Sequence, residues 1–275
     1  MTVCISAICN SKKAIVLASD GMITSNMPPI QFETVTKKMT TLSDTCIALT
    51  AGDALAYAEL FDRAKLEISK ENKKEINNIV DEIKKSYIFL RKRAIQERIL
   101  NPRAFDDFNS FYEKQQTLLA NVALTIQKQI DQFNYRLDIL ICGVSKGEAH
   151  IYAIINPGTS ICYDNLGFSV IGIGYIHAIN TLIARECHPQ KNLEEVFLIV
   201  YEAKKRAESA PGVGSKVTDL SIITQEGIIQ FPREQIDKVD EIYKMWIEHK
   251  TEWKNELGKL IEKVSKVSKE QGENN

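Results

Sequence analysis

Alternation of apolar and polar side chains predicts four strands near the start of the chain. Residues 2–9 place Val3, Ile5 and Ala7 on one face, which is the two-residue period of a strand. Short polar turns separate the apolar runs that follow. The four predicted strands cover residues 2–9, 14–20, 37–43 and 45–52, and we expect them to pair as two antiparallel hairpins.

A helical period replaces this alternation after Gly52. Asp53 is a typical helix N-cap, and from there apolar residues recur three or four positions apart. The same spacing returns later and is interrupted at Asn101-Pro102. Helices are predicted from residue 53, over 75–98, over about 113–133, over 175–187 and over 193–209, the last with a capping-box pattern at Asn192 and Glu195.

Strand patterns return in the second half of the chain. They cover residues 136–144, 149–156, 167–174, 217–224 and 227–231. Strands and helices thus come in groups rather than in strict alternation. This order predicts an α+β protein with antiparallel sheets and helices on their outer faces.

The chain after the last predicted strand has a different pattern. From Ile236 to Val267 a seam of residues spaced three and four apart is apolar except at Lys250, which is typical of a heptad repeat on a long helix. We therefore divide the chain into a domain over 1–232, with a charged helical insertion at about 71–114, and a C-terminal segment over 233–275 with a frayed end. The long helix would dock on its own domain or pair with another subunit.

Composition excludes several classes of function. The 275 residues carry a net charge of −1, which gives no basic footprint for nucleic acid or an anionic membrane. No run approaches the roughly 20 apolar residues of a membrane helix, and the first residues lack a signal-peptide pattern. We therefore expect a cytoplasmic protein with no nucleic-acid or membrane partner.

Cysteines and histidines are scattered along the chain. None of the six cysteines forms a CxxC motif, and Cys187 beside His188 lacks two further zinc ligands at a usable spacing. The Gly-x-Gly at 172–174 is a weak phosphate signal that a tight turn explains better. We expect buried free thiols and neither a metal nor a cofactor.

The start of the chain offers candidate nucleophiles. If Met1 is removed, which is routine before a small residue, Thr2 becomes a terminal residue. Its hydroxyl can then attack a carbonyl while its own α-amine, with a pKa of about 7.7–8.0, serves as the base. Cys4 lies on the same strand face and could do the same chemistry if the preceding three residues were cut off.

The order of short motifs resembles the proteasome β-subunit and its bacterial ring-protease relatives of the HslV type. The near-terminal threonine is followed by AIVLASDG, by TKKMTTLSDTCIALTAG running into DALAYAELF, and later by ILICGV, HIYAIINPG, KRAESAPG and VTDLSIIT. The resemblance covers residues 2–70 and 115–230 in the same order. It implies a four-layer αββα sandwich, N-terminal nucleophile (Ntn) hydrolysis, and a homo-oligomer that forms a ring or a smaller assembly.

The resemblance also implies roles for particular residues. They are Thr2 as nucleophile, Asp20 as the strand-end acid, Lys38 as the catalytic lysine, Gly52 as an oxyanion-hole amide, Glu208 as the later acid, and Thr50 beside an S1-type pocket. A lysine ammonium near the hydroxyl lowers the cost of forming the alkoxide, and an acid orients the lysine. An unfoldase ATPase that feeds unfolded polypeptide to the site is the partner that the family would use.

Three features depart from the family pattern. Ile173 and Pro211 stand where the family has serines, with Ser209 and Ser215 as substitutes if the register differs. A gap-free match would place Cys4 rather than Thr2 at the nucleophile position. The region 71–114 is longer than the family's connection.

Each site residue also has an ordinary structural explanation. Asp20 before Gly21 fits a plain turn, Lys38 fits a solvated strand edge, and Gly52–Asp53 fits a helix cap. Three functions therefore stay open. They are a threonine peptidase or amidase acting through an acyl-enzyme on Thr2, a catalytically inactive scaffold subunit, and a small-molecule amidase that uses Cys4.

Overall fold

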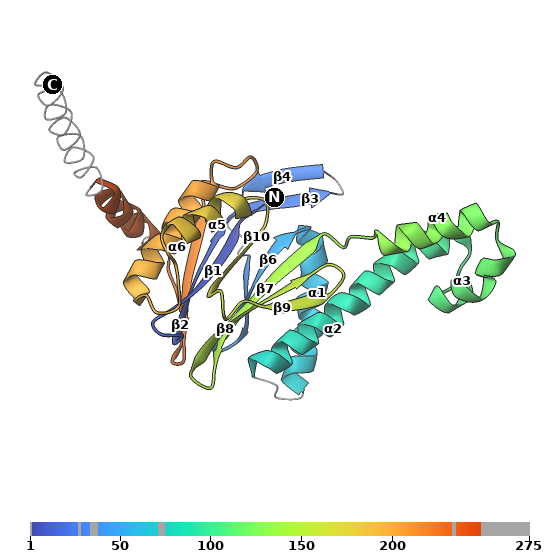
Figure 1. The fold of residues 1–275 in the computed structure, drawn as a ribbon, viewed down its shortest axis with the longest axis horizontal. Coiled ribbons are helices and arrows are strands. Elements are labelled where there is room, and N and C mark those ends of the chain that lie inside the picture. Colours follow the sequence, from blue (N-terminus) through green and yellow to red (C-terminus); the bar gives the residue numbers. More distant parts are fainter. Residues whose placement is uncertain (1, 27–28, 34–37, 71–74, 233–234, 249–275) are drawn as a thin grey trace, which may run out of the picture. The chain divides into compact units, whose positions relative to one another are not determined.

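The computed structural model describes the chain apart from residues 1, 27–28, 34–37, 71–74, 233–234 and 249–275 (Figure 1). The chain divides into two compact units, Met1–Gln230 and Phe231–Asn275. In the second unit, residues 235–248 are helical. The rest of the predicted heptad helix lies outside the described residues.

Two antiparallel five-stranded sheets form the first unit, which confirms the α+β class. One sheet has the order β10 (Phe168–Ile171), β1 (Cys4–Cys9), β2 (Ala14–Asp20), β11 (Thr218–Thr224) and β12 (Gly227–Gln230). The other has the order β5 (Met39–Ser43), β6 (Cys46–Gly52), β7 (Leu137–Ser145), β8 (Glu148–Ile155) and β9 (Thr159–Cys162). A separate hairpin of β3 (Met22–Asn26) and β4 (Pro29–Glu33) follows β2.

The two sheets pack against each other through a shared hydrophobic core. Ile8 and Leu17 of the first sheet belong to the same buried cluster as Leu49 and Leu140 of the second. Every residue of β1 and β2 is buried, because helix α6 (Leu193–Ala207) contacts these strands on their other side. Burying a large apolar side chain contributes about 1.5–3 kcal/mol, so this core is a main source of stability.

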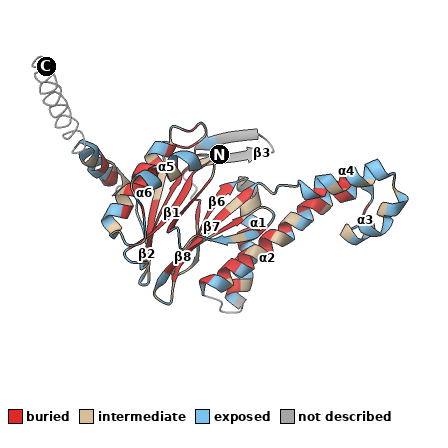
Figure 2. Ribbon diagram, viewed as in Figure 1, coloured by how far each residue is buried: buried red, intermediate tan, exposed pale blue. Residues whose placement is uncertain are grey.

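Helices cover the outer faces of both sheets (Figure 2). Helix α5 (Tyr175–Ala184) contacts β10 and packs on α6, whose N-cap Asn192 accepts a hydrogen bond from Glu195 N at 2.8 Å, as predicted. Helices α1 (Ala54–Lys70) and α2 (Ile76–Ile95) share a second buried cluster with β6, β7 and β8.

The end of α2 and the helices that follow it have a small core of their own. The end of α2 continues as a π-helical turn, Gln96–Leu100, and a 3-10 turn, Asn101–Arg103, before α3 (Phe108–Lys114) and α4 (Ala120–Asp131). Residues of these helices form a third buried cluster that includes Ile99, Phe111 and Ile126. Residues 132–136 then lead from α4 into β7.

Most predicted elements are present, and the differences have local causes. The predicted helix over 113–133 is wrong at its start, because a 3-10 turn at Gln115–Thr117 and extended backbone at Leu118 and Leu119 precede α4. Of the apolar stripe that predicted this helix, Ile126 and Ile130 are buried on α4, whereas Leu118 precedes the helix and Val122 is 40% exposed. Strands β3, β4 and β9 were not predicted, since their short runs lack a clear alternation.

The cysteines are all free thiols, five of them buried and Cys162 exposed. Among the described residues, no group of three or more histidine, cysteine or acidic side chains is placed to hold a metal ion. No helix in the described part of the chain has the length and apolar character needed to span a membrane.

We expect the first unit to lose stability in alkaline solution. Burial raises the pKa of Cys4, Cys9, Cys46 and Cys187 to about 12, whereas an exposed thiol has a pKa of about 8.5. Above pH ~8.5 the unfolded chain therefore releases protons that the folded chain keeps, and the free energy of unfolding falls. Each such thiol should lower it by about 2 kcal/mol between pH 8 and pH 10.

Urea unfolding of Cys46→Ala at the two pH values measures this effect. The variant should show a smaller pH dependence than the unmodified chain, by about the contribution of one thiol. Ile47→Val is the matched control, because it trims an adjacent buried side chain and should cost about 0.5–1.5 kcal/mol at both pH values alike. An identical pH dependence in Cys46→Ala and Ile47→Val would contradict the prediction.

Candidate active site at Thr2

Thr2 and Asp20 meet because of the register of the first hairpin. Cys4 pairs with Ser19, and Asp20 N donates a hydrogen bond to Val3 O at 3.3 Å. The side chain of Asp20 then turns back along β1: its Oδ1 accepts from Val3 N at 3.0 Å and from the hydroxyl of Thr2. The short hairpin alone thus brings the predicted acid to Thr2.

Lys38 reaches the same point from the second sheet. It directly precedes β5, where its carbonyl oxygen accepts from Thr50 N at 3.3 Å. Its ammonium group donates to the Thr2 hydroxyl and, at 2.6 Å, to Asp20 Oδ1. The predicted nucleophile, acid and lysine are therefore in mutual contact, although they come from two sheets.

The carboxylate of Asp20 is buried and surrounded by donors. Its second oxygen accepts from Met22 N at 3.2 Å and from Gly214 N at 2.7 Å. Asp20 is fully buried, and Thr2 and Lys38 are 3% and 7% exposed. Because a buried charge must be paired and hydrogen-bonded to be tolerated, the Lys38 ammonium and three backbone amides explain how this carboxylate is held.

A cavity of about 490 Å³ opens beside the Thr2 side chain; we call it the Thr2 cavity. Residues of both sheets line it, together with the turn before α5 and the 132–136 segment. The lining comprises Thr2, Ala51, Gly52, Asn134, Arg136, Asp138, Ala153, Ile155, Tyr163, Ser169, Val170, Ile171, Gly172, Ile173 and Tyr175. This cavity offers space for a substrate next to the candidate nucleophile.

Gly52 lies in this cavity at the end of β6. It has φ +132°, and a Cβ at this position would lie 2.1 Å from Arg136 O, so only glycine fits. Asp53 N donates to Arg136 O at 3.1 Å, which makes the neighbouring Gly52 a non-hydrogen-bonded position of the β6–β7 ladder. The Gly52 N–H consequently points away from β7, as an amide that binds an oxyanion requires.

The Gly-x-Gly turn holds the backbone of Thr2. Gly174 N donates to Thr2 O at 3.3 Å. A Cβ on Gly172, which has φ +93°, would lie 2.3 Å from the same oxygen. Ile173 between them is half exposed and lines the cavity with an apolar side chain.

Two predicted residues lie away from this contact. Glu208 forms ion pairs with Lys204 at 2.6 Å and Lys205 at 3.4 Å, and no hydrogen bond joins it to Thr2, Asp20 or Lys38. Thr50 is buried and does not line the Thr2 cavity. Their catalytic and substrate-binding roles stay predictions.

Cys4 is placed less favourably than Thr2 for nucleophilic attack. It is fully buried in the core between the sheets, and its thiol donates to Thr50 O at 3.4 Å. Burial raises the pKa of Cys4 to about 12, although the charge of Lys38 opposes this increase. The thiolate that attacks a carbonyl is therefore disfavoured at this position.

Sequence reasoning missed two polar groups near Thr2. Gly214 supplies an amide to Asp20 from the loop after α6, and a hydrogen bond from a backbone amide leaves no signal in the sequence. Asp138 lines the Thr2 cavity. The sequence does contain a pattern that could have identified Asp138, because an acidic residue within the apolar run LDILICGV is unusual.

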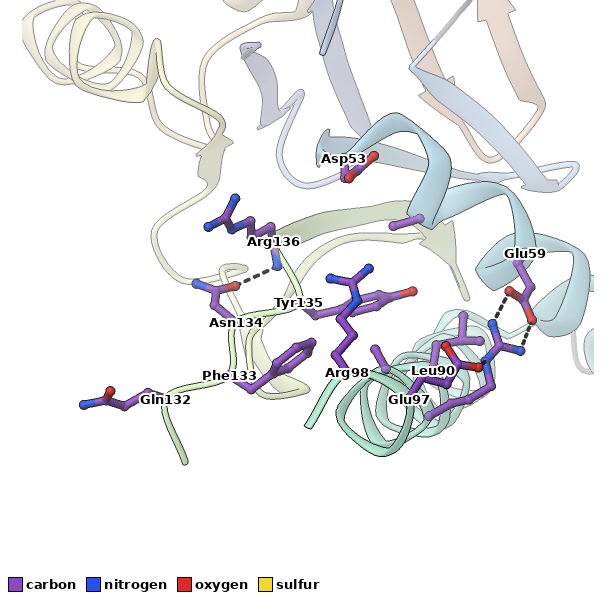
Figure 3. Close-up of a pocket in the computed structure, with 13 residues that line it drawn as sticks. Asp53, Glu59, Leu90, Glu97, Arg98, Gln132, Phe133, Asn134, Tyr135 and Arg136 are labelled. Atoms are coloured by element: carbon purple, nitrogen blue, oxygen red, sulfur yellow. Dashed lines mark hydrogen bonds and ion pairs between the residues drawn. The ribbon is translucent and has the colours of Figure 1, made fainter. Parts of the chain in front are cut away.

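A second cavity, of about 680 Å³, shares Asn134 and Arg136 with the Thr2 cavity (Figure 3). It lies between α1, α2 and the 132–136 segment. Arg93 donates to both carboxylate oxygens of Glu59 at 2.5 Å, so part of its charge is already paired. The described lining contains no serine, threonine, cysteine, lysine or histidine, and we therefore place the candidate active site in the Thr2 cavity.

Comparison with known protein families and curated proteins does not assign the chain to a family. No protein-family model matches the chain, and a search of curated proteins found no match.

Proposed function

We propose that the protein is an N-terminal threonine hydrolase of the proteasome-like Ntn class that cleaves peptide or other amide bonds. The observation that carries this proposal is the contact of the Thr2 hydroxyl with both Lys38 and Asp20. The Lys38 ammonium also pairs with the buried carboxylate of Asp20, and its contact with the Thr2 hydroxyl would lower the cost of forming the alkoxide that attacks a carbonyl. The helix contacts on the outer faces of the two sheets support the αββα sandwich that this class would have.

The reaction requires a free α-amine at Thr2, so every residue before it must be removed. The Thr2 hydroxyl then attacks the carbonyl carbon of the amide, and the α-amine takes the hydroxyl proton. The Lys38 ammonium stabilises the developing alkoxide, while Asp20 fixes the position of Lys38. The Gly52 amide binds the oxyanion; losing one such donor typically costs about 10²–10³ in rate.

Collapse of the tetrahedral intermediate breaks the C–N bond, and the α-ammonium returns its proton to the leaving amine. The acyl group is now an ester on Thr2 Oγ. Water, activated by the same amine, hydrolyses this ester and restores the hydroxyl. A homo-oligomer and an unfoldase partner belong to the proposal because of the family resemblance, and a cytoplasmic location belongs to it because no apolar run in the sequence is long enough for a membrane helix.

A specific observation favours one alternative, the inactive scaffold subunit. Ile173 and Pro211 leave the site without the family's two hydroxyls, and Ser209 donates to Arg206 O instead of to the site. In that case the Thr2, Asp20 and Lys38 contact would only join the two sheets.

Intact mass and covalent labelling test the proposal. The purified protein should lack Met1. It should also bind one molecule of a peptide vinyl sulfone covalently, because the Thr2 oxygen adds to the double bond of the reagent. Tryptic mapping should place the adduct on Thr2 in both the unmodified chain and Cys4→Ala. Retention of Met1 would refute the proposal, an adduct on Cys4 would favour the thiol amidase, and a processed chain that gains no adduct would favour the scaffold.

A further inference from the structure

One acidic side chain faces the Thr2 cavity from the second sheet. Along β7, Leu140 and Cys142 belong to the core between the sheets, whereas Leu137 and Ile139 face the α1 and α2 side. Strand alternation therefore directs Asp138 toward the space between the sheets, at the end where Thr2 lies.

The charge of Asp138 has no partner in the described part of the chain. Among the described residues, no hydrogen bond or ion pair involves its half-buried carboxylate, and Arg136, two positions earlier, does not pair with it. Arg136 has φ +57°, which breaks the strand alternation, and it is exposed. Burial raises the pKa of Asp138. A partly buried carboxylate without a partner is stabilised when a cation enters the cavity and pairs with it.

The walls around Asp138 suit the stem of a long basic side chain. Ala51, Ala153 and Ile155 form apolar surface on the second sheet, and Ile171 faces them from the first. Lysine and arginine bury their methylene groups along such surface while the charged end reaches a polar partner. A neutral or acidic side chain would leave Asp138 unpaired or repelled.

We propose that Asp138 is a specificity-determining residue of the Thr2 site and binds a positively charged side chain, lysine or arginine, next to the scissile amide. The inference rests on the proposed hydrolase function and adds the substrate class. An ion pair in a partly buried site contributes more than a surface pair.

A peptide mixture read by mass spectrometry tests the proposal on both sides of the cleaved bond. All peptides share one central sequence, and each carries lysine, norleucine or glutamate at one of the positions on either side of the bond that is cleaved. The processed full-length chain should prefer lysine over norleucine, and Asp138→Asn should reduce cleavage of lysine peptides by about 10- to 100-fold, with norleucine peptides little changed. Asp138→Lys should shift the preference toward glutamate. Asp106→Asn, in the exposed turn before α3, is the matched control and should keep the lysine preference.

Two results would overturn the inference while the hydrolase proposal stands. They are a chain that cleaves peptides without preferring lysine, and an Asp138→Asn variant with an unchanged preference. A processed chain that neither cleaves peptides nor gains a vinyl sulfone adduct would refute the hydrolase proposal itself. Thr2 labelling of Asp138→Asn by a norleucine vinyl sulfone shows that the variant is folded.

Discussion

A chain with Thr2→Ala is expected to hydrolyse amides about 10⁴- to 10⁶-fold more slowly than the unmodified protein, the range found when a hydrolase loses its nucleophile. The change removes the Thr2 hydroxyl, which contacts both Lys38 and Asp20. Alanine is small, so Met1 should still be removed and the α-amine should still be free. Steady-state hydrolysis of a lysine-containing fluorogenic amide measures the loss.

Two other variants separate a missing nucleophile from a damaged fold. Thr2→Ser keeps the oxygen and should retain most of the activity. Cys4→Ala empties part of the core between the sheets and should lower stability while leaving the rate per folded molecule nearly unchanged. Loss of activity in Cys4→Ala, with full activity in Thr2→Ala, would assign the nucleophile to Cys4.

The sequence predicts those parts of the site that depend on local structure. The contact between Thr2 and Asp20 follows from the register of a short hairpin, whose two strands the patterns of residues 2–9 and 14–20 predict. The Gly52–Asp53 boundary is likewise local, since strand and helix periods meet there. The roles of Asp20, Lys38 and Gly52 were all assigned through the family resemblance, and the contact of Lys38 with Thr2 also needs the second sheet to face the first.

Features that depend on packing could not be predicted from the sequence. The amide of Gly214 reaches Asp20 across 194 positions of the chain, and no periodicity describes such a contact. The predicted helix over 113–133 was wrong at its start, because a 3-10 turn and extended backbone at Leu118 precede α4, and Val122 of the predicted apolar stripe is 40% exposed. An apolar stripe indicates a helix face but does not say whether another element covers it.

The ion pair of Lys38 and Asp20 should give the largest effect on stability. Asp20→Asn leaves a buried ammonium without its counter-charge, and Lys38→Met does the same to the carboxylate. Breaking one side of such a pair costs about 3–5 kcal/mol, so each variant should unfold at a clearly lower urea concentration. Both should also lose labelling at Thr2, because Lys38→Met removes the ammonium that contacts the hydroxyl and Asp20→Asn removes the charge that holds this ammonium in place.

The stability of the double variant Asp20→Asn/Lys38→Met shows whether the two side chains act as a buried ion pair or independently of each other. It should lose less stability than the sum of the two single changes, since no unpaired charge stays buried, and it should still resist labelling. The pair of Glu59 and Arg93 is the control, because both side chains are about half exposed and their coupling should stay near 0.2–1 kcal/mol. Equal coupling in the two pairs would mean that Lys38 and Asp20 are solvated, and the hydroxyl of Thr2 would then lack the buried cation on which its proposed reactivity depends.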